Sequence, residues 1–182
     1  MNKKRSMHKS QAGMALFISL VLLLVLTIIG VSAVQITSLE VRMTRNEHDS
    51  LLAFEAAESA LRDAEQQLEG ITNIAMFTPS GNAGLYQVAP LDQEEHWAGA
   101  AVWEGANSIT APTEIAEVAN DPRYIIEHVA SVLREDNAYQ QENAYGGGAS
   151  DRVEIFRITA LGIGGSENAR VLLQSSYGRV LD

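Results

Sequence analysis

The chain lacks cysteine altogether. A disulfide, a thiolate metal site and a cysteine nucleophile are therefore excluded. Basic residues are also scarce, with 13 Lys and Arg against 23 Asp and Glu, which gives a formal net charge of −10. This balance argues against a protein that binds free nucleic acid, because such a protein needs a basic surface to displace counterions. What the 182 residues do contain is 46% apolar side chains, enough for one globular domain, or for one domain plus an appendage.

The charges that exist are unevenly placed. Residues 1–13 contain Lys3, Lys4, Arg5 and Lys9 and no acidic residue, whereas residues 14–34 contain no charged residue at all. A helix of 21 residues is about 31 Å long, which matches the roughly 30 Å hydrocarbon core of a bilayer. The hydroxyls of Ser19, Thr27 and Ser32 can bond back to the helix backbone. We therefore expect a basic leader at 1–13 and a transmembrane helix at 14–34.

The basic leader also predicts the orientation. Positive residues stay on the cytoplasmic side, so the N-terminus is expected in the cytoplasm and the acidic remainder across the membrane. Arg42 and Arg45 follow the span and oppose this orientation mildly. In a Gram-negative cell the predicted location is the inner membrane, with a periplasmic C-terminal domain.

Beyond the span, residues 35–70 are predicted to continue the helix into the globular domain. No proline interrupts Met14–Glu69, so one continuous helix is possible. Its second half has apolar residues at helical spacing: Leu51, Phe54, Ala57, Leu61, Ala64 and Leu68. We expect this stripe to pack on a sheet, with Leu51, Phe54, Leu61 and Leu68 as its large residues. Gly70 is a candidate C-cap. A coiled coil is the alternative, but the stripe is short and a globular segment follows.

Residues 71–182 are predicted to form a β-rich domain. Strands are expected at 124–133, 153–163 and 171–177, the last two joined as an antiparallel hairpin through the turn-rich residues 164–168. A fourth, edge strand is expected at 100–104, and 135–151 reads as a polar, glycine-rich loop. The predicted fold class is α+β, with a long N-terminal helix packed on an antiparallel sheet.

Candidate chemistry is sparse. His48, His96 and His128 lack metal-ligand spacing, and residues 162–165 indicate a hairpin turn rather than a phosphate-binding loop. Acidic residues near the loop lack the pattern of a calcium site: Glu135, Asp136, Glu142 and Asp151. No catalytic residue, metal or cofactor is predicted, and no enzyme.

The segment around Gly13 resembles the processing site of type IV pilins and pseudopilins, in which a basic leader ending in glycine precedes an apolar helix. That resemblance implies cleavage between Gly13 and Met14 by a membrane aspartyl prepilin peptidase and N-methylation of Met14. It also implies that the apolar helix packs with other such helices during assembly, through Met14, Leu16, Phe17, Ile18, Leu20, Leu24 and Gly30. Small residues such as Gly30 allow helices to approach closely.

Residues 26–33, 39–43 and 52–62 resemble the N-terminal region of PilX-type minor pilins, and residues 156–165 and 169–177 resemble their C-terminal region. The resemblance implies a minor pilin of the type IV pilus, priming assembly at or near the tip and supporting adhesion or twitching motility. Implied partners are the lipid bilayer, other minor pilins, the major pilin, the inner-membrane assembly machinery and a tip adhesin.

The chain departs from the major pilins at the fifth residue after the processing site. Major pilins carry Glu there, whereas this chain has Ile18. Either Ile18 is one more lipid-facing residue, or the subunit sits at the fibre tip, where no subunit lies above it. The alternative functions are a minor pseudopilin of a type II secretion system and a membrane-anchored periplasmic binding module that does not polymerise.

Overall fold

The computed structural model describes residues 12–133 and 152–181. The chain divides between Arg45 and Asn46 into two units, which are described separately below. The first unit is helical throughout the described residues, and the second contains the C-terminal part of the same helix and a sheet.

Helix α1 comprises Ala12–Glu69, as the absence of proline predicts. In the first unit, the side-chain hydroxyls of Ser19, Thr27 and Ser32 each donate to a main-chain carbonyl three or four residues earlier, at 2.8, 2.7 and 2.9 Å. These bonds confirm the expected way in which the apolar segment accommodates polar side chains.

The end of α1 is capped from the sheet. The N–H groups of Gly70 and Ile71 donate to Gln67 O and Leu68 O in a tightened last turn. The guanidinium of Arg179 also donates to Leu68 O and Ile71 O. Gly70 follows the last helical residue, but its φ angle is not positive, so the helix ends without the left-handed glycine cap that the sequence suggested.

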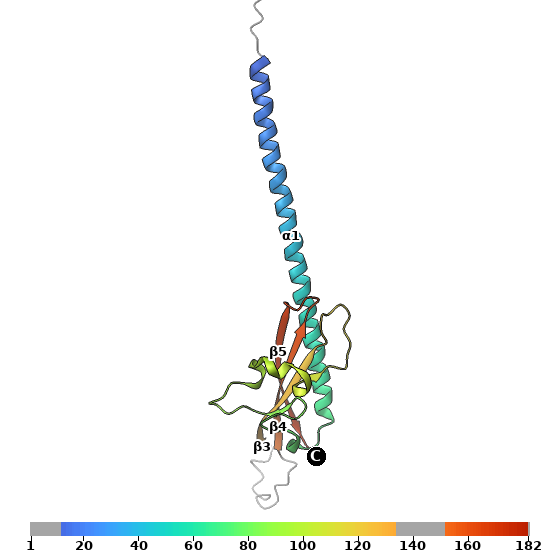
Figure 1. The fold of residues 1–182 in the computed structure, drawn as a ribbon. Coiled ribbons are helices and arrows are strands. Elements are labelled where there is room, and N and C mark those ends of the chain that lie inside the picture. The colour runs from blue at the N-terminus through green and yellow to red at the C-terminus, as the bar shows by residue number, and fades with distance from the viewer. Residues whose placement is uncertain (1–11, 134–151, 182) are drawn as a thin grey trace, which may run out of the picture. The chain divides into compact units, whose positions relative to one another are not determined.

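The second unit contains a five-stranded sheet (Figure 1). Its main strands are β3 (Arg123–Leu133), β4 (Arg152–Ile163) and β5 (Arg170–Val180), and they form an antiparallel meander. Two short strands, β1 (Leu85–Gln87) and β2 (Ile109–Thr110), pair with the other side of β3, β1 in parallel and β2 antiparallel. The sheet order is therefore β1-β3-β4-β5, and β5 forms one edge.

Each face of the sheet is covered by a different part of the second unit. α1 packs on one face, where the largest apolar cluster includes Leu68, Phe77, Ile126, Phe156 and Ile158. A smaller cluster on the other face joins Ile125 of β3 to Tyr86, Val102, Trp97 and Trp103. The latter three lie in a segment of short 3-10 helices, η2 (His96–Ala98), η3 (Ala100–Trp103) and η4 (Gly105–Asn107).

The α+β class and the packing of a long N-terminal helix on a C-terminal sheet are confirmed. Two details of the prediction are wrong. The sheet is mixed, because β1 runs parallel to β3. Residues 100–104 do not form a strand: Ala100–Trp103 is a 3-10 helix that buries Val102 against β3.

Candidate assembly surfaces and processing site

The apolar segment of α1 is the most exposed hydrophobic surface of the first unit. Every large apolar side chain from Met14 to Val34 is at least 40% exposed. The predicted assembly residues belong to this surface: Met14, Leu16, Phe17, Ile18, Leu20 and Leu24. Gly30 belongs to it as well, and a β-carbon added there would have no atom within 4 Å apart from the neighbouring helix backbone. One helix in this unit is apolar and long enough to cross a membrane. Exposed surface of this kind is stable only in lipid or against other apolar helices.

The predicted processing site lies in the first turn of α1. The helix begins at Ala12, so Gly13 and Met14 are its second and third residues. The leader residues before Ala12 lie outside the described residues. The first acidic residue after Gly13 is Glu40, so neither Ile18 nor any other position of the span supplies a carboxylate.

The second unit buries a face of α1 that overlaps the predicted apolar stripe only in part. The buried residues are small: Ala53, Ala56, Ala57, Ala60 and Ala64, ending with Leu68. Of the predicted packing residues, Leu68 is buried and Leu61 is partly buried against the same cluster. Leu51 and Phe54 are 57% and 41% exposed, so their expected packing on the sheet is wrong.

The physical reason lies in β4. A β-carbon added to Gly162 would overlap Ala53 O and lie 2.5 Å from Ala57 N and 3.0 Å from Ala57 Cβ. One added to Gly164 would overlap Asp49 O. The backbones of helix and strand therefore touch, and only glycine on the strand and alanine on the helix leave room. Larger Leu51 and Phe54 lie outside this contact.

Polar side chains fix the position of this part of α1 on the sheet. The Asp49 carboxylate accepts hydrogen bonds from Ser166 N, at 2.9 Å, and from the Ser166 hydroxyl. These bonds hold the pKa of Asp49 below its usual value. Further along, Asp63 accepts from Thr113 N and Oγ1 at 3.0 and 2.8 Å. The register of the helix is thus set at both ends of its buried face.

Two tyrosines of the sheet complete these links. Tyr124 Oη donates to Gln67 Oε1 at 2.5 Å, and Tyr177 Oη donates to Glu69 Oε1 at 2.6 Å. Burial, with a smaller effect from the charge of Asp63, raises the pKa of Tyr124 to about 12. Tyr124 therefore remains a hydrogen-bond donor at any physiological pH.

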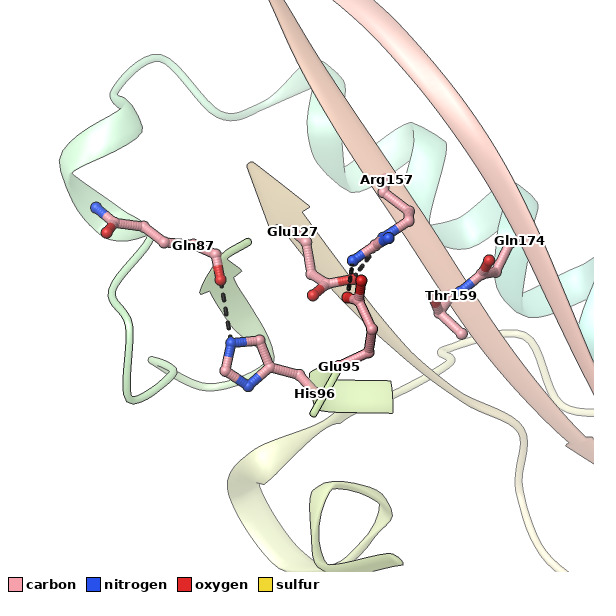
Figure 2. A network of polar contacts seen from close by, with 7 residues as sticks. All are labelled: Gln87, Glu95, His96, Glu127, Arg157, Thr159 and Gln174. Atoms are coloured by element: carbon pink, nitrogen blue, oxygen red, sulfur yellow. Dashed lines mark hydrogen bonds and ion pairs between the residues drawn. The ribbon is translucent and has the colours of Figure 1, made fainter. Parts of the chain in front are cut away.

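The opposite face of the sheet contains an ion network built around one buried carboxylate (Figure 2). Glu127 is completely buried, and its Oε2 accepts from Arg157 Nε at 2.8 Å. Arg157 also pairs with Glu95, next to His96, whose ring nitrogen lies 3.1 Å from Gln87 O. The network ties the 3-10 segment to β3 and β4. Gln174 of β5 donates to Thr159 Oγ1 beside it, at 3.0 Å.

A second buried carboxylate lies on the helix side of the sheet. Glu154 Oε2 accepts from the Ser131 hydroxyl and lies 2.7 Å from His128 Nε2. Burial raises the pKa of Glu154, but the bonds to Ser131 and His128 outweigh burial and hold it below its usual value. Serine and histidine both bind the carboxylate rather than each other, so this is not the geometry of a nucleophile and its base.

The other candidates from the sequence do not come together. His48 lies on α1, His96 binds the backbone of β1 and His128 pairs with Glu154. Within residues 12–133 and 152–181, no three His, Asp or Glu side chains are grouped as metal ligands. Glu135, Asp136, Glu142 and Asp151, with the predicted loop 135–151, lie outside the described residues.

Sequence reasoning missed Gly162 and Gly164 as packing residues because it interpreted residues 162–165 as a turn. The turn is present, since Gly164 N donates to Ala169 O at 2.9 Å. Gly162, however, belongs to β4 and lies against α1. The useful signal was the repeated alanine at positions 53, 56, 57, 60 and 64, which matches a glycine on the facing strand.

Two family models match the chain, and together they cover most of it. The model described as PilX N-terminal matches residues 12–62. The model described as the C-terminal part of type IV pilus assembly protein PilX matches residues 56–179. Comparison with curated proteins and with solved structures found no match. An exposed apolar helix followed by a helix-on-sheet unit is consistent with membrane anchoring and assembly, and the chain belongs to the PilX family of type IV pilus assembly proteins.

Proposed function

We propose that this protein is a minor pilin that is processed at Gly13 and then joins the pilus through the apolar segment of α1. The observation that carries the proposal is the exposure of the whole uncharged surface from Met14 to Val34. In the membrane this surface contacts lipid. In the fibre it exchanges lipid for the apolar helices of neighbouring subunits, an exchange that close packing at Gly30 favours.

Orientation and partners form part of the proposal. The leader with Lys3, Lys4, Arg5 and Lys9 stays in the cytoplasm, where a prepilin peptidase cleaves before Met14 and methylates it. The second unit is then periplasmic and meets other minor pilins, the major pilin or a tip adhesin. Adhesion and twitching motility follow from incorporation into the fibre. No cofactor is required.

A place at or near the tip is supported by Ile18. A carboxylate at the centre of a bilayer costs about 2.5–3.5 kcal/mol on insertion scales, and one at residue 18, nearer the N-terminal end of the span 14–34, costs part of that. A subunit without one avoids that cost but also lacks a partner for the charged N-terminus of a subunit above it. A position with no subunit above loses nothing by this absence, and such a subunit can prime assembly.

Processing is tested by mass spectrometry of the N-terminal peptide of the protein isolated from membranes. The expected residue is N-methyl-Met14. Gly13→Val is expected to keep the leader. The control is Ala12→Val, which introduces the same valine one residue earlier and is expected to be processed normally. An intact Met1 in the unaltered protein would contradict the proposal and leave a membrane anchor that does not polymerise.

The tip position is tested by Ile18→Glu, with Ile18→Leu as the matched control. We expect Ile18→Glu to change how the subunit is distributed along sheared filaments and which minor pilins co-purify with it, and Ile18→Leu to change neither. If Ile18→Glu is incorporated in the same amount and at the same place as the unaltered protein, the tip hypothesis is wrong. Filaments that still contain a version without residues 14–34 would overturn the assembly mechanism itself.

A further inference from the structure

We propose that the free edge of β5 binds an extended strand of a different pilus subunit, so that the sheet continues from one subunit into the next. This inference rests on the proposed function, because it identifies the kind of partner that the second unit meets in the fibre.

The first observation is that one side of the β5 backbone has no partner strand among the residues that the structure describes. This strand, Arg170–Val180, pairs with β4 on one side and forms the end of the sheet on the other. Hydrogen-bonded and non-hydrogen-bonded residue pairs alternate in an antiparallel ladder. The bond from Gly164 N to Ala169 O fixes this alternation for the register Gly162↔Val171. The even-numbered residues of β5 therefore direct their N–H and C=O groups away from β4.

Those same residues are uncovered. They belong to the face opposite α1, and all five of these residues in the range 170–178 are exposed: Arg170, Leu172, Gln174, Ser176 and Gly178. In the part of the chain that the structure describes, no backbone hydrogen bond reaches their outward groups. The edge thus offers a row of donors and acceptors along 11 residues.

The second observation is that β5 lacks the usual protection of an exposed edge. Soluble proteins protect such edges with lysine, proline, bulges or short strands. β5 has no lysine or proline, no irregularity interrupts its register with β4, and residues 171–178 are uncharged. An edge that is long, regular and uncharged binds extended strands readily.

The third observation concerns charge. Arg170 and Arg179 stand at the two ends of the uncharged stretch. Both donate to main-chain carbonyls, Arg170 to Glu167 O and Arg179 to Leu68 O and Ile71 O. Among the described residues neither forms an ion pair with a carboxylate. A partner strand that complements this edge is therefore uncharged over about eight residues, the length of the stretch 171–178. It has acidic residues at both ends, opposite the two arginines.

A second copy of this chain is a poor partner. Two β5 edges paired antiparallel reverse the direction of the α1 segment that lies on each sheet, which does not suit subunits pointing the same way in a fibre. A head-to-tail contact would need the opposite edge of the sheet. Within residues 12–133 and 152–181, that edge consists of two short strands, Leu85–Gln87 (β1) and Ile109–Thr110 (β2). A different subunit that supplies a long strand meets both conditions.

The first test is Ser176→Pro in the full-length chain, compared with Ser176→Ala. Proline at 176 removes one outward N–H and leaves the bonds to β4 in place, since proline is tolerated on sheet edges. The Ser176 side chain makes no hydrogen bond within the described residues. Both variants, purified in detergent, should melt within a few degrees of the unaltered protein. Per copy in the membrane, Ser176→Pro should enter sheared filaments at least tenfold less, and Ser176→Ala within twofold of normal. Normal incorporation of Ser176→Pro would overturn the inference.

Amide hydrogen exchange provides a second test that does not depend on the proline variant folding. In the free full-length protein, the N–H groups of Leu172, Gln174 and Ser176 should exchange rapidly, and in filaments at least tenfold more slowly. Those of Leu173, Ser175 and Tyr177, which face β4, should be protected in both. Rapid exchange at the even residues in filaments would refute the docked strand while leaving the proposed function intact. Protection already in the free protein would mean that the chain covers its own edge, and this too refutes the inference. Absence of the unaltered protein from filaments would refute both.

Discussion

Replacement of Gly162 by alanine tests the backbone contact between α1 and β4. The new β-carbon would overlap Ala53 O and lie 2.5 Å from Ala57 N, whereas favourable van der Waals contacts between carbon atoms have distances of about 3.5–4.0 Å. The obstacles are main-chain atoms of a helix fixed by Asp49 and Asp63, so the helix must withdraw by about 1 Å. Overpacking of this kind costs about 1–3 kcal/mol.

A smaller effect has the opposite sign. Alanine reduces the conformational freedom of the unfolded chain and so stabilises by about 0.4–1 kcal/mol where the native backbone suits it. Because backbone atoms cannot move aside as side chains do, we expect the upper part of the overpacking range and a net loss of about 1–2.5 kcal/mol. For a unit of this size that is a fall in melting temperature of roughly 3–10 °C. The assay is thermal and urea unfolding of the full chain in detergent.

Two matched variants make the result interpretable. Gly178→Ala adds the same methyl group on β5, where the nearest atoms are Ile155 Cδ1 and Val153 Cγ1 at 3.4 Å; its stability should change by no more than about 0.5 kcal/mol. Ala57→Gly removes a side chain but no backbone atom, so it should not rescue Gly162→Ala. Equal stabilities of the two alanine variants, or full rescue by Ala57→Gly, would refute the backbone contact.

Three further predictions concern other parts of the second unit and are tested by unfolding measurements. Arg157→Met leaves the buried carboxylate of Glu127 uncompensated and should cost about 3–5 kcal/mol, part of which Glu127→Gln in the same chain should restore; additive losses would contradict the pairing. Glu154→Gln should cost about 1–3 kcal/mol at pH 7. The folded-state pKa of Glu154 is lowered from 4.5, so its contribution to the free energy of unfolding is present above that value and is lost as the pH falls through the folded-state pKa. The difference in stability between the variant and the unaltered protein should therefore shrink in acid. A difference that does not depend on pH would contradict this prediction. Leu68→Ala should cost about 2–5 kcal/mol. Leu51→Ala and Phe54→Ala, at exposed positions, should each cost about 0.5 kcal/mol or less. A large loss of stability in Leu51→Ala would instead support the prediction that Leu51 packs on the sheet.

The elements with strong local signals were predictable from the sequence. The bounds of α1, β3, β4 and β5 lie within a few residues of the predicted ones, because each depends on a long run of suitable residues free of proline. β1 and β2 have three and two residues and were not predicted. Such short strands form only because β3 offers them its edge, and a local pattern does not contain that information.

The buried helix face was predicted only in part, for a different reason. The predicted stripe includes Ala57 and Ala64, which are buried, but also Leu51 and Phe54, which are exposed, and it leaves out Ala53. Scales of hydrophobicity rank leucine and phenylalanine above alanine, so they favour Leu51 and Phe54. The structure buries the alanines instead, because Gly162 brings a backbone within contact of the helix and leaves room only for small side chains.

The burial of alanines in place of Leu51 and Phe54 leaves apolar surface on the second unit. The second unit buries its small helix residues under its own sheet and leaves Leu51 and Phe54 on the surface, although burial of each against a partner is worth about 1.5–3 kcal/mol. A monomer gains nothing from large apolar residues in those positions, whereas a subunit packed among others does. The same division appears in the first unit, where the apolar surface from Met14 to Val34 is wholly exposed within the chain. Both units therefore leave apolar surface open to lipid or to other molecules, which agrees with membership of a pilus assembly family.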